Sequence, residues 1–176
     1  MIRISTATMA WILAGTVGAS AADLVADMRA VTAEGVDRTL GTVEVTDSPS
    51  GAVFTPMLAG LPPGTHGFHV HAKGDCGPGP DDKGEIVAAG AAGGHWDPAG
   101  TGKHLGPEGE GHLGDLPALV AAAEGTAAQP VTAPRITDVR QLAGLALMIH
   151  AGGDNHSDHP EPLGGGGARI ACGVLD

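Results

Sequence analysis

The segment 67–71, which reads Gly-Phe-His-Val-His, constrains the fold of this chain more than any other. Its apolar residues and histidines alternate strictly, and alternate residues of a β-strand point to the same face. We therefore expect a strand that buries Phe68 and Val70 on one side. The two histidines, His69 and His71, then lie side by side on the other side and make half of a site for zinc, copper, iron or nickel. An isolated pair of this kind is more often two surface histidines, so the interpretation depends on further ligands.

Further candidates are present, because all nine histidines of the 176-residue chain lie between positions 66 and 159. The chain is long enough for one domain with a sizeable core. It contains 30 glycines and 13 prolines but only 2% aromatic residues, a composition typical of short strands joined by many turns. Its formal net charge of −11 argues against nucleic acid as a partner.

Residues 1–21 have the features of an export signal. A positive charge at Arg3 precedes the apolar run 9–17, and 19–21 reads Ala-Ser-Ala, a small-residue cleavage site. The apolar run is too short to span a bilayer. We therefore expect cleavage to leave a mature domain at 22–176, without a membrane span, in an oxidising compartment.

The rest of the chain reads as about eight short strands joined by turns, as in an all-β sandwich or barrel. They are expected at 24–31, 42–46, 52–58, 67–71, 116–123, 130–136, 145–150 and 169–175. Prolines place the strand 130–136 at a sheet edge, because proline cannot donate to a ladder, and 137–142 is expected to form one helical turn. Two long loops remain, 74–114 and 151–168. Loops of such length are usually functional or disordered, and the candidate ligands in the first loop favour function.

Seven residues in four segments are of the kinds that bind transition metals: His69, His71, His95, His104, His112, Asp115 and His150. Four of them lie in the first loop or directly after it and are separated by eight, seven and two residues: His95, His104, His112 and Asp115. Their three imidazoles and one carboxylate make a closed tetrahedral zinc set. The three histidines on expected strands lack one nitrogen of the tetragonal four-nitrogen set that suits Cu(II).

The segments that carry these residues resemble the copper/zinc superoxide dismutases, specifically the exported bacterial branch. They read GFHVHAKGDC, AGGHWDP, GKHLGPEGEGHLGDLPALV, LMIHAGGDN and PLGGGGARIACGV, in one order from Gly67 to Val174, with a weaker match from Gly41 onward. The resemblance implies an eight-stranded antiparallel Greek-key barrel or sandwich, immunoglobulin-like in architecture, located in the periplasm.

The resemblance also implies a role for each candidate ligand. It assigns copper to His69, His71, His95 and His150, and zinc to His95, His104, His112 and Asp115. One copper and one zinc per chain then share His95, which binds both metals through its two ring nitrogens.

Other residues gain roles from the same resemblance. Asp154 corresponds to a carboxylate that links a copper ligand to a zinc ligand, and Arg169 to an arginine at the mouth of the copper channel. The two cysteines, Cys76 and Cys172, correspond to a disulfide. Three histidines are left over: His66 is expected to make structural hydrogen bonds, and His156 and His159 to be exposed in the second loop.

The implied reaction is the dismutation of superoxide to dioxygen and hydrogen peroxide, with His95 exchanging a proton during turnover and zinc in a structural role. Two other classes compete. A zinc hydrolase needs an open zinc position, which Asp115 closes, and a copper carrier needs neither the bridging His95 nor Arg169. The substrate is a small anion that Lys73, Lys83 and Lys103, in or beside the metal-bearing loop, are placed to attract. Self-association is left open.

Overall fold

The computed structural model describes residues 23–81 and 83–176, and the export signal expected at 1–21 lies outside them. Its main sheet is built from β1 (Leu24–Thr32), β2 (Gly35–Thr46), β3 (Ala52–Ala59), β5 (Phe68–His71), β9 (Thr126–Ala127), β10 (Val131–Ala133), β11 (Ala146–His150) and β12 (Arg169–Val174). Two smaller pairs join β4 (Gly64–His66) to β8 (Leu119–Ala121) and β6 (Gly79–Pro80) to β7 (Ile86–Val87). Three short 3-10 helices complete the described part: η1 (Gly90–Ala92), η2 (Val139–Leu142) and η3 (Pro162–Gly165).

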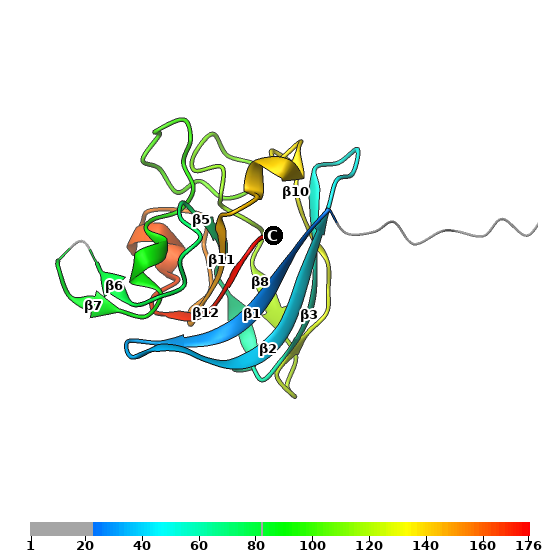
Figure 1. The fold of residues 1–176 in the computed structure, drawn as a ribbon. Helices are drawn as coiled ribbons and strands as arrows, with labels where there is room; N and C mark the ends of the chain where they lie inside the picture. The colour runs from blue at the N-terminus through cyan, green and yellow to red at the C-terminus, as the bar shows by residue number, and fades with distance from the viewer. Residues whose placement is uncertain (1–22, 82) are drawn as a thin grey trace, which may run out of the picture.

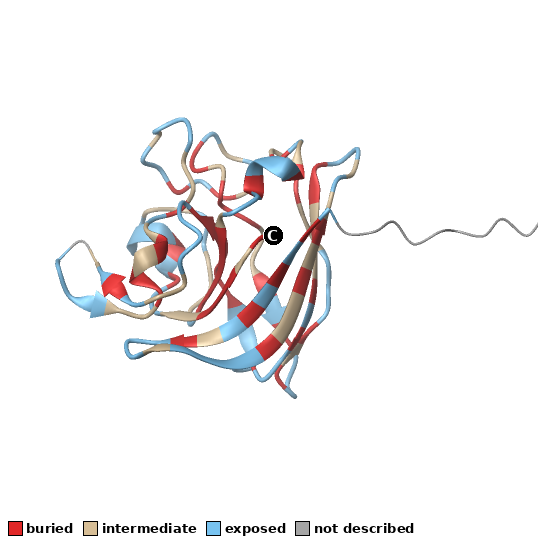
Figure 2. Cartoon of the chain, viewed as in Figure 1, coloured by how far each residue is buried: buried red, intermediate tan, exposed pale blue. Residues whose placement is uncertain are grey.

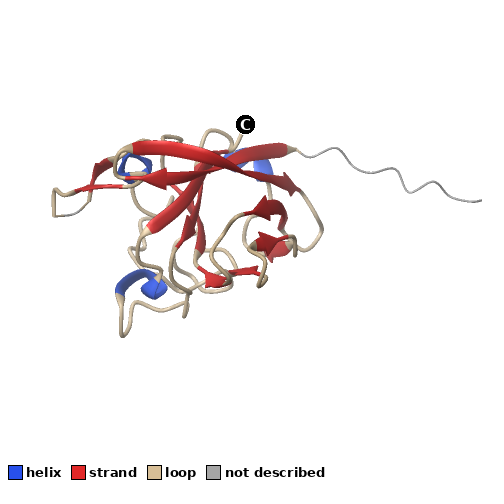
Figure 3. Ribbon diagram, turned by 90° about the horizontal axis from the view of Figure 1, so that it is seen from below, coloured by secondary structure: helices blue, strands red, loops and turns tan. Residues whose placement is uncertain are grey.

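The main sheet has eight strands, in the order β10, β3, β2, β1, β12, β11, β5, with β9 also paired to β3. Each of its pairings is antiparallel. The C-terminal strand β12 lies between β1 and β11, so strands from both ends of the chain are neighbours. Such long returns between adjacent strands are found in Greek-key folds. Figures 1 and 3 show the sheet curling into a half-barrel. The expectation of an antiparallel all-β fold is confirmed. The main sheet also has the expected number of strands, but it includes β9, which was not expected, while the strand expected at 116–123 pairs with β4 outside it.

The concave side of the curled sheet encloses the apolar core. Buried and exposed residues alternate along β1, which gives the banded colouring of that strand in Figure 2. Phe54 and Phe68 meet edge to face in the core, with ring centroids 5.9 Å apart, a favoured arrangement of aromatic rings. Phe68 and Val70 are both fully buried, as the alternation in this segment predicts. The apolar side of β5 therefore fixes the strand in the core and leaves its histidines to the other side.

Several expected boundaries differ from the structure. β2 begins at Gly35 rather than at 42. The sequence does not predict this earlier start, because residues 36–39 of the strand are exposed and show no alternation of apolar and polar side chains. The strand expected at 116–123 is reduced to β8, since Pro117 has no N–H for a ladder. The strand expected at 130–136 is reduced to β10, which does lie at the sheet edge.

The first loop is also more ordered than its composition predicts, because it contains the β6–β7 hairpin and η1. The helical turn expected at 137–142 is the 3-10 helix η2, in which the Arg140 N–H donates to the side chain of Asp138 and the Val139 N–H donates to that of Asp47. Among the described residues, none of the helices is long and apolar enough to cross a membrane.

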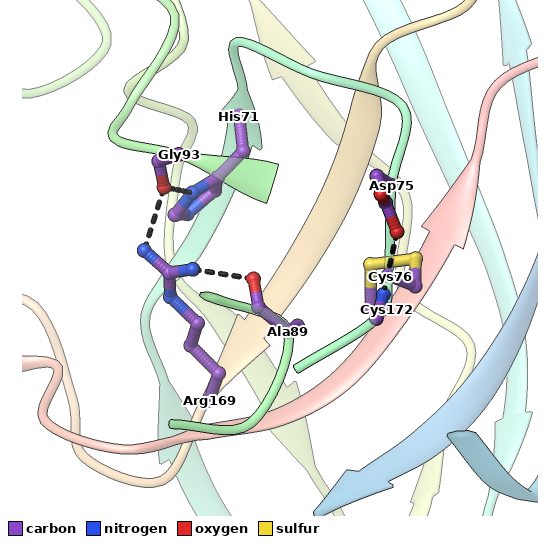
Figure 4. The surroundings of a disulfide bond; sticks show 8 residues. His71, Asp75, Cys76, Ala89, Gly93, Arg169 and Cys172 are labelled. Atoms are coloured by element: carbon purple, nitrogen blue, oxygen red, sulfur yellow. Dashed lines mark hydrogen bonds between the residues drawn. A yellow bond between two sulfur atoms is a disulfide. The ribbon is translucent and has the colours of Figure 1, made fainter. Parts of the chain in front are cut away.

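A disulfide joins Cys76, near the start of the first loop, to Cys172 in β12, as expected (Figure 4). The two cysteines are 96 positions apart in the sequence. Cys172 is buried in a small apolar cluster with Val31, Ala92 and Met148. The bond therefore ties the glycine-rich first loop to the middle of the main sheet.

Replacing Cys76 by serine should lower the free energy of unfolding by about 2–5 kcal/mol, because the open chain gains the entropy that the long closed loop denies it. Denaturant unfolding of the oxidised protein, the reduced protein and the variant measures the difference. The reduced protein and the variant should unfold together. A variant as stable as the oxidised protein would contradict the prediction.

Candidate metal centre

The histidine-bearing strand β5 ends the main sheet, and its free edge is covered by the first loop. The N–H of Val70 donates to the Gly114 carbonyl at 2.9 Å, and the Val70 carbonyl accepts from the N–H of Trp96 at 2.8 Å. Single bridges also pair His69 with Asp115 and His71 with His95. An open strand edge invites pairing with other chains. Here the segment that covers the edge also places loop ligands beside the strand histidines.

A first group of donors consists of four buried histidines: His69, His71, His95 and His150. One nitrogen from each lies within 4.8 Å of the others. β11 pairs with β5 in a register that places Ala146 opposite His71 and His150 beyond Phe68. The rings of His71 and His150 nevertheless reach each other, with their Nε2 atoms 3.4 Å apart. The ring of His95 reaches in from the loop and stacks on that of His69 at 4.0 Å between centroids. The loop thus supplies the fourth nitrogen that the strands lack.

The outer nitrogens of the three strand histidines are hydrogen-bonded, and these bonds fix the tautomers. The Nδ1 of His71 donates to the Gly93 carbonyl at 2.8 Å, and that of His150 to the Gly167 carbonyl at 3.1 Å. The Nε2 of His69 donates to the Asp154 carboxylate at 2.7 Å. A neutral imidazole that donates through one nitrogen has its lone pair on the other. All three lone pairs are therefore directed into the group, with the ring orientations held from outside.

A second group of buried donors contains His95, His104, His112 and Asp115. The Asp115 carboxylate lies 2.9 Å from His95 Nδ1, 3.0 Å from His104 Nδ1 and 3.4 Å from His112 Nδ1. Only the contact with His95 is aligned as a hydrogen bond. The donor atoms converge on one another as ligands converge on an ion. His95 is the residue that the two groups share.

Asp154 connects the groups from the second loop. Its two carboxylate oxygens accept from His69 Nε2 at 2.7 Å and from His104 Nε2 at 2.8 Å. Gly164 allows this contact. It has a φ of +70°, and a methyl group on it would lie 2.0 Å from Asp154 Oδ1 and 2.8 Å from His104 Nε2.

Four ring nitrogens in the two groups are buried without a hydrogen-bond partner: His69 Nδ1, His95 Nε2, His104 Nδ1 and His112 Nδ1. A buried polar atom left in this way costs about 1–3 kcal/mol. A metal ion on each side would satisfy all four. Nitrogen-only donors on one side and three imidazoles with a carboxylate on the other fit copper and zinc respectively.

Burial keeps the strand histidines neutral. Loss of hydration lowers the pKa of His69 to about 3, although its hydrogen bond with Asp154 opposes the shift. In the same way, burial lowers the pKa of His150 to about 4 against the bond to the Gly167 carbonyl. Both rings are therefore in the form that binds a metal at neutral pH.

His104 differs because two carboxylates flank it. Burial favours its neutral form, but Asp115 and Asp154 raise its pKa to about 9. Burial likewise favours the neutral form of both carboxyls, yet the histidines that surround each carboxylate hold its pKa well below its usual range. In the metal-free protein His104 is thus in its charged form, with a proton on both ring nitrogens. Zinc must displace one of these protons to bind, so zinc affinity should rise with pH.

Arg169 lies outside the first group, at the start of β12. Its guanidinium donates to the carbonyls of Ala89 at 2.5 Å and Gly93 at 2.6 Å. The Gly93 carbonyl also accepts from His71, so one backbone oxygen joins the arginine to that histidine (Figure 4). Two surface cavities, of about 280 and 170 Å³, both have Arg169 in their walls.

The structure brings together all seven candidate ligands and Asp154. His66 is buried, and its ring nitrogens lie 2.8 Å from the carbonyls of His150 and Pro62, which is the structural role expected of it. His156 and His159 are exposed. The acceptors Gly93 and Gly167 were missed by sequence reasoning, because a backbone carbonyl is present at every residue and gives no signal.

Comparison with known proteins identifies the family. A sequence model described as copper/zinc superoxide dismutase matches residues 39–175. The chain belongs to this family. Its reaction is therefore the dismutation of superoxide, and its cofactors are copper and zinc.

Relatives of this dismutase cover almost its whole length. A copper–zinc superoxide dismutase of Salmonella typhimurium is 55% identical over 99% of both chains, and one of Escherichia coli K12 is 53% identical over the same shares. Among solved structures, the enzyme from Brucella abortus superposes with a TM-score of 0.83 at 49% identity, covering 86% of this chain and 98% of that one. The monomeric enzyme from Salmonella enterica gives 0.77 at 57% identity, covering 89% and 100%. These structures share the fold described above.

Replacing Gly164 by alanine should separate Asp154 from His104 and weaken zinc binding by about 10- to 100-fold, the usual effect of losing a partner of a metal ligand. Competition with a zinc chelator measures the affinity. Gly100→Ala is the matched control, because Gly100 has a φ of +63° with open space around it. Equal zinc affinities in the two variants would show that only backbone strain had been measured.

Proposed function

We propose that the two donor groups are the copper and zinc sites of this dismutase. Copper is held by His69, His71, His95 and His150, and zinc by His95, His104, His112 and Asp115. The observation that carries the proposal is the shared position of His95, with Nδ1 toward Asp115 and Nε2 buried without a partner. When bound, copper supplies the one-electron changes of oxidation state and zinc supplies fixed positive charge.

Within this arrangement His95 is the group that handles a proton. Its Nε2 atom accepts a proton in one half of the cycle and releases it in the other. Its Nδ1 atom stays on the side of Asp115, so the ring keeps its place while the proton moves. Asp154 orients His69 and His104 in both halves of the cycle.

Arg169 binds and orients the anionic substrate. Guanidinium remains charged at all relevant pH values and offers several donors in a fixed plane. Its bonds to the Ala89 and Gly93 carbonyls set its position relative to His71. Lys73, Lys83 and Lys103 are exposed in or beside the first loop and add to the local attraction.

We further infer that the protein is exported to the periplasm and acts there as a monomer. The charged, apolar and small-residue features of 1–21 support export. The Cys76–Cys172 disulfide fits an oxidising compartment. A monomer is supported by the similarity to the Salmonella enterica enzyme, which is described as monomeric.

Loading the protein with both metals should give one copper and one zinc per chain by elemental analysis. His95→Ala should retain some copper through the three strand histidines but remove the link between the metals. The visible spectrum of copper should then respond to zinc in the wild type and not in the variant. His159→Ala, at an exposed histidine, is the control and should behave as the wild type. If zinc left the visible spectrum of copper unchanged in the wild type, His95 could not be a ligand shared by both metals.

A superoxide-decay assay with increasing salt tests the role of Arg169. Arg169→Ala should lower the rate roughly tenfold or more, and Lys73→Ala or Lys83→Ala about two- to threefold, because local positive charge concentrates the anion. The wild-type rate should fall with added salt, which screens that attraction, and the fall should flatten in the variants.

Arg140→Ala is the control for this experiment, because Arg140 is exposed and paired with Asp138 at 2.8 Å. A wild-type rate that rises with ionic strength would mean that the net charge of −11 dominates over local attraction. A protein that binds copper without accelerating superoxide decay would be a copper carrier.

A further inference from the structure

The ligand His112 has less support for its ring than the other members of the second group. His95 donates to Asp115 and His104 to Asp154, so these two rings are oriented by side chains. Among residues 23–81 and 83–176, no hydrogen bond to the ring of His112 is present, and its Nδ1 is buried without a partner. The hydrogen bonds that hold this residue are therefore those of its backbone.

The backbone of His112 is held on both sides. Its N–H donates to the Lys103 carbonyl at 2.8 Å, which closes the segment between two zinc ligands on itself. Its carbonyl accepts from Nη1 of Arg135 at 3.1 Å, and the Gly111 carbonyl accepts from Nη2 of the same arginine at 3.1 Å. Two N–H groups on two successive carbonyls form a forked contact that a planar guanidinium provides and an ammonium does not.

Arg135 is itself mounted on a fixed turn. It follows β10, and the turn is closed by bonds from the Ile136 N–H to the Ala133 carbonyl and from the Ala52 N–H to the Ile136 carbonyl. Ala133 and Ile136 are 2% and 1% exposed. Within the described part of the chain, no carboxylate forms an ion pair with Arg135. Its described contacts thus serve the backbone of the first loop.

We propose that Arg135 is a positioning residue for the zinc site. It holds the backbone of His112 at the sheet edge and so helps to direct a ring that has no hydrogen bond of its own toward the position of zinc. This inference rests on the proposed assignment of His112 as a zinc ligand. It predicts an effect on the zinc side of the centre and little on the copper side, because the strand histidines have hydrogen-bond partners of their own.

The test compares Arg135→Met, which keeps the length of the side chain and removes its donors, with the wild type. Zinc affinity, measured by chelator competition, should fall about 10- to 100-fold, and copper affinity should change less than threefold. The visible spectrum of Co(II) bound in place of zinc should shift, because it reports the geometry of the ligands. Arg135→Lys keeps the positive charge but loses the forked pair of donors, so its zinc affinity should lie between those of the wild type and Arg135→Met. This variant replaces Arg135→Met in the test if the methionine variant fails to fold.

Arg38→Met is the matched control. Arg38 also donates to a loop carbonyl, that of Gly60 at 2.8 Å, but it contacts no ligand segment in the described chain. The Arg38→Met variant should have the zinc affinity and the Co(II) spectrum of the wild type. Wild-type zinc affinity and an unchanged spectrum in both Arg135 variants would overturn the proposal. His112→Ala separates the two levels, because unchanged zinc affinity in that variant would overturn the ligand assignment itself.

Discussion

The centre depends on one carboxylate, that of Asp154, which accepts from His69 and His104 at 2.7 and 2.8 Å. The ring of His69 belongs to a strand of the sheet, and that of His104 belongs to the stretch between η1 and β8, which has no helix or strand. A single bidentate acceptor therefore fixes the distance between the rigid half and the adaptable half of the site. The close approach of Gly164 leaves no room for any side chain there, which shows how tightly the second loop is fitted around this contact.

The physical cost of the centre is the burial of polar rings. Histidines in both groups are excluded from water, and four of their nitrogens have no hydrogen-bond partner in the described chain. The apolar residues of β5 and β11 offset this cost by packing in the core, and the outer nitrogens keep their bonds to Gly93, Gly167 and Asp154. Metal binding then gives these buried ligand nitrogens the partner that they lack in the metal-free protein. Folding stability and metal content are consequently linked in this protein.

Much of the fold and the donor set could be predicted from sequence, because the decisive patterns are local. Alternation places His69 and His71 on one side of a strand, and the short spacings from His95 to Asp115 keep those ligands in one loop. Contacts between distant segments could not be predicted in this way. Arg135 reaches the carbonyls of Gly111 and His112 across 24 and 23 positions, and a backbone acceptor has no identity in a sequence. The early start of β2 was missed for a related reason, since its first residues are exposed and lack periodicity.

The central claim is that two different metals lie on opposite sides of the His95 ring. Anomalous diffraction from crystals of the doubly loaded protein, recorded at the copper and zinc absorption edges, tests it most directly. The account predicts two separate peaks per chain, one among His69, His71 and His150 and the other among His104, His112 and Asp115, with the imidazole of His95 between them. A single peak, or two peaks on the same side of that ring, would contradict it.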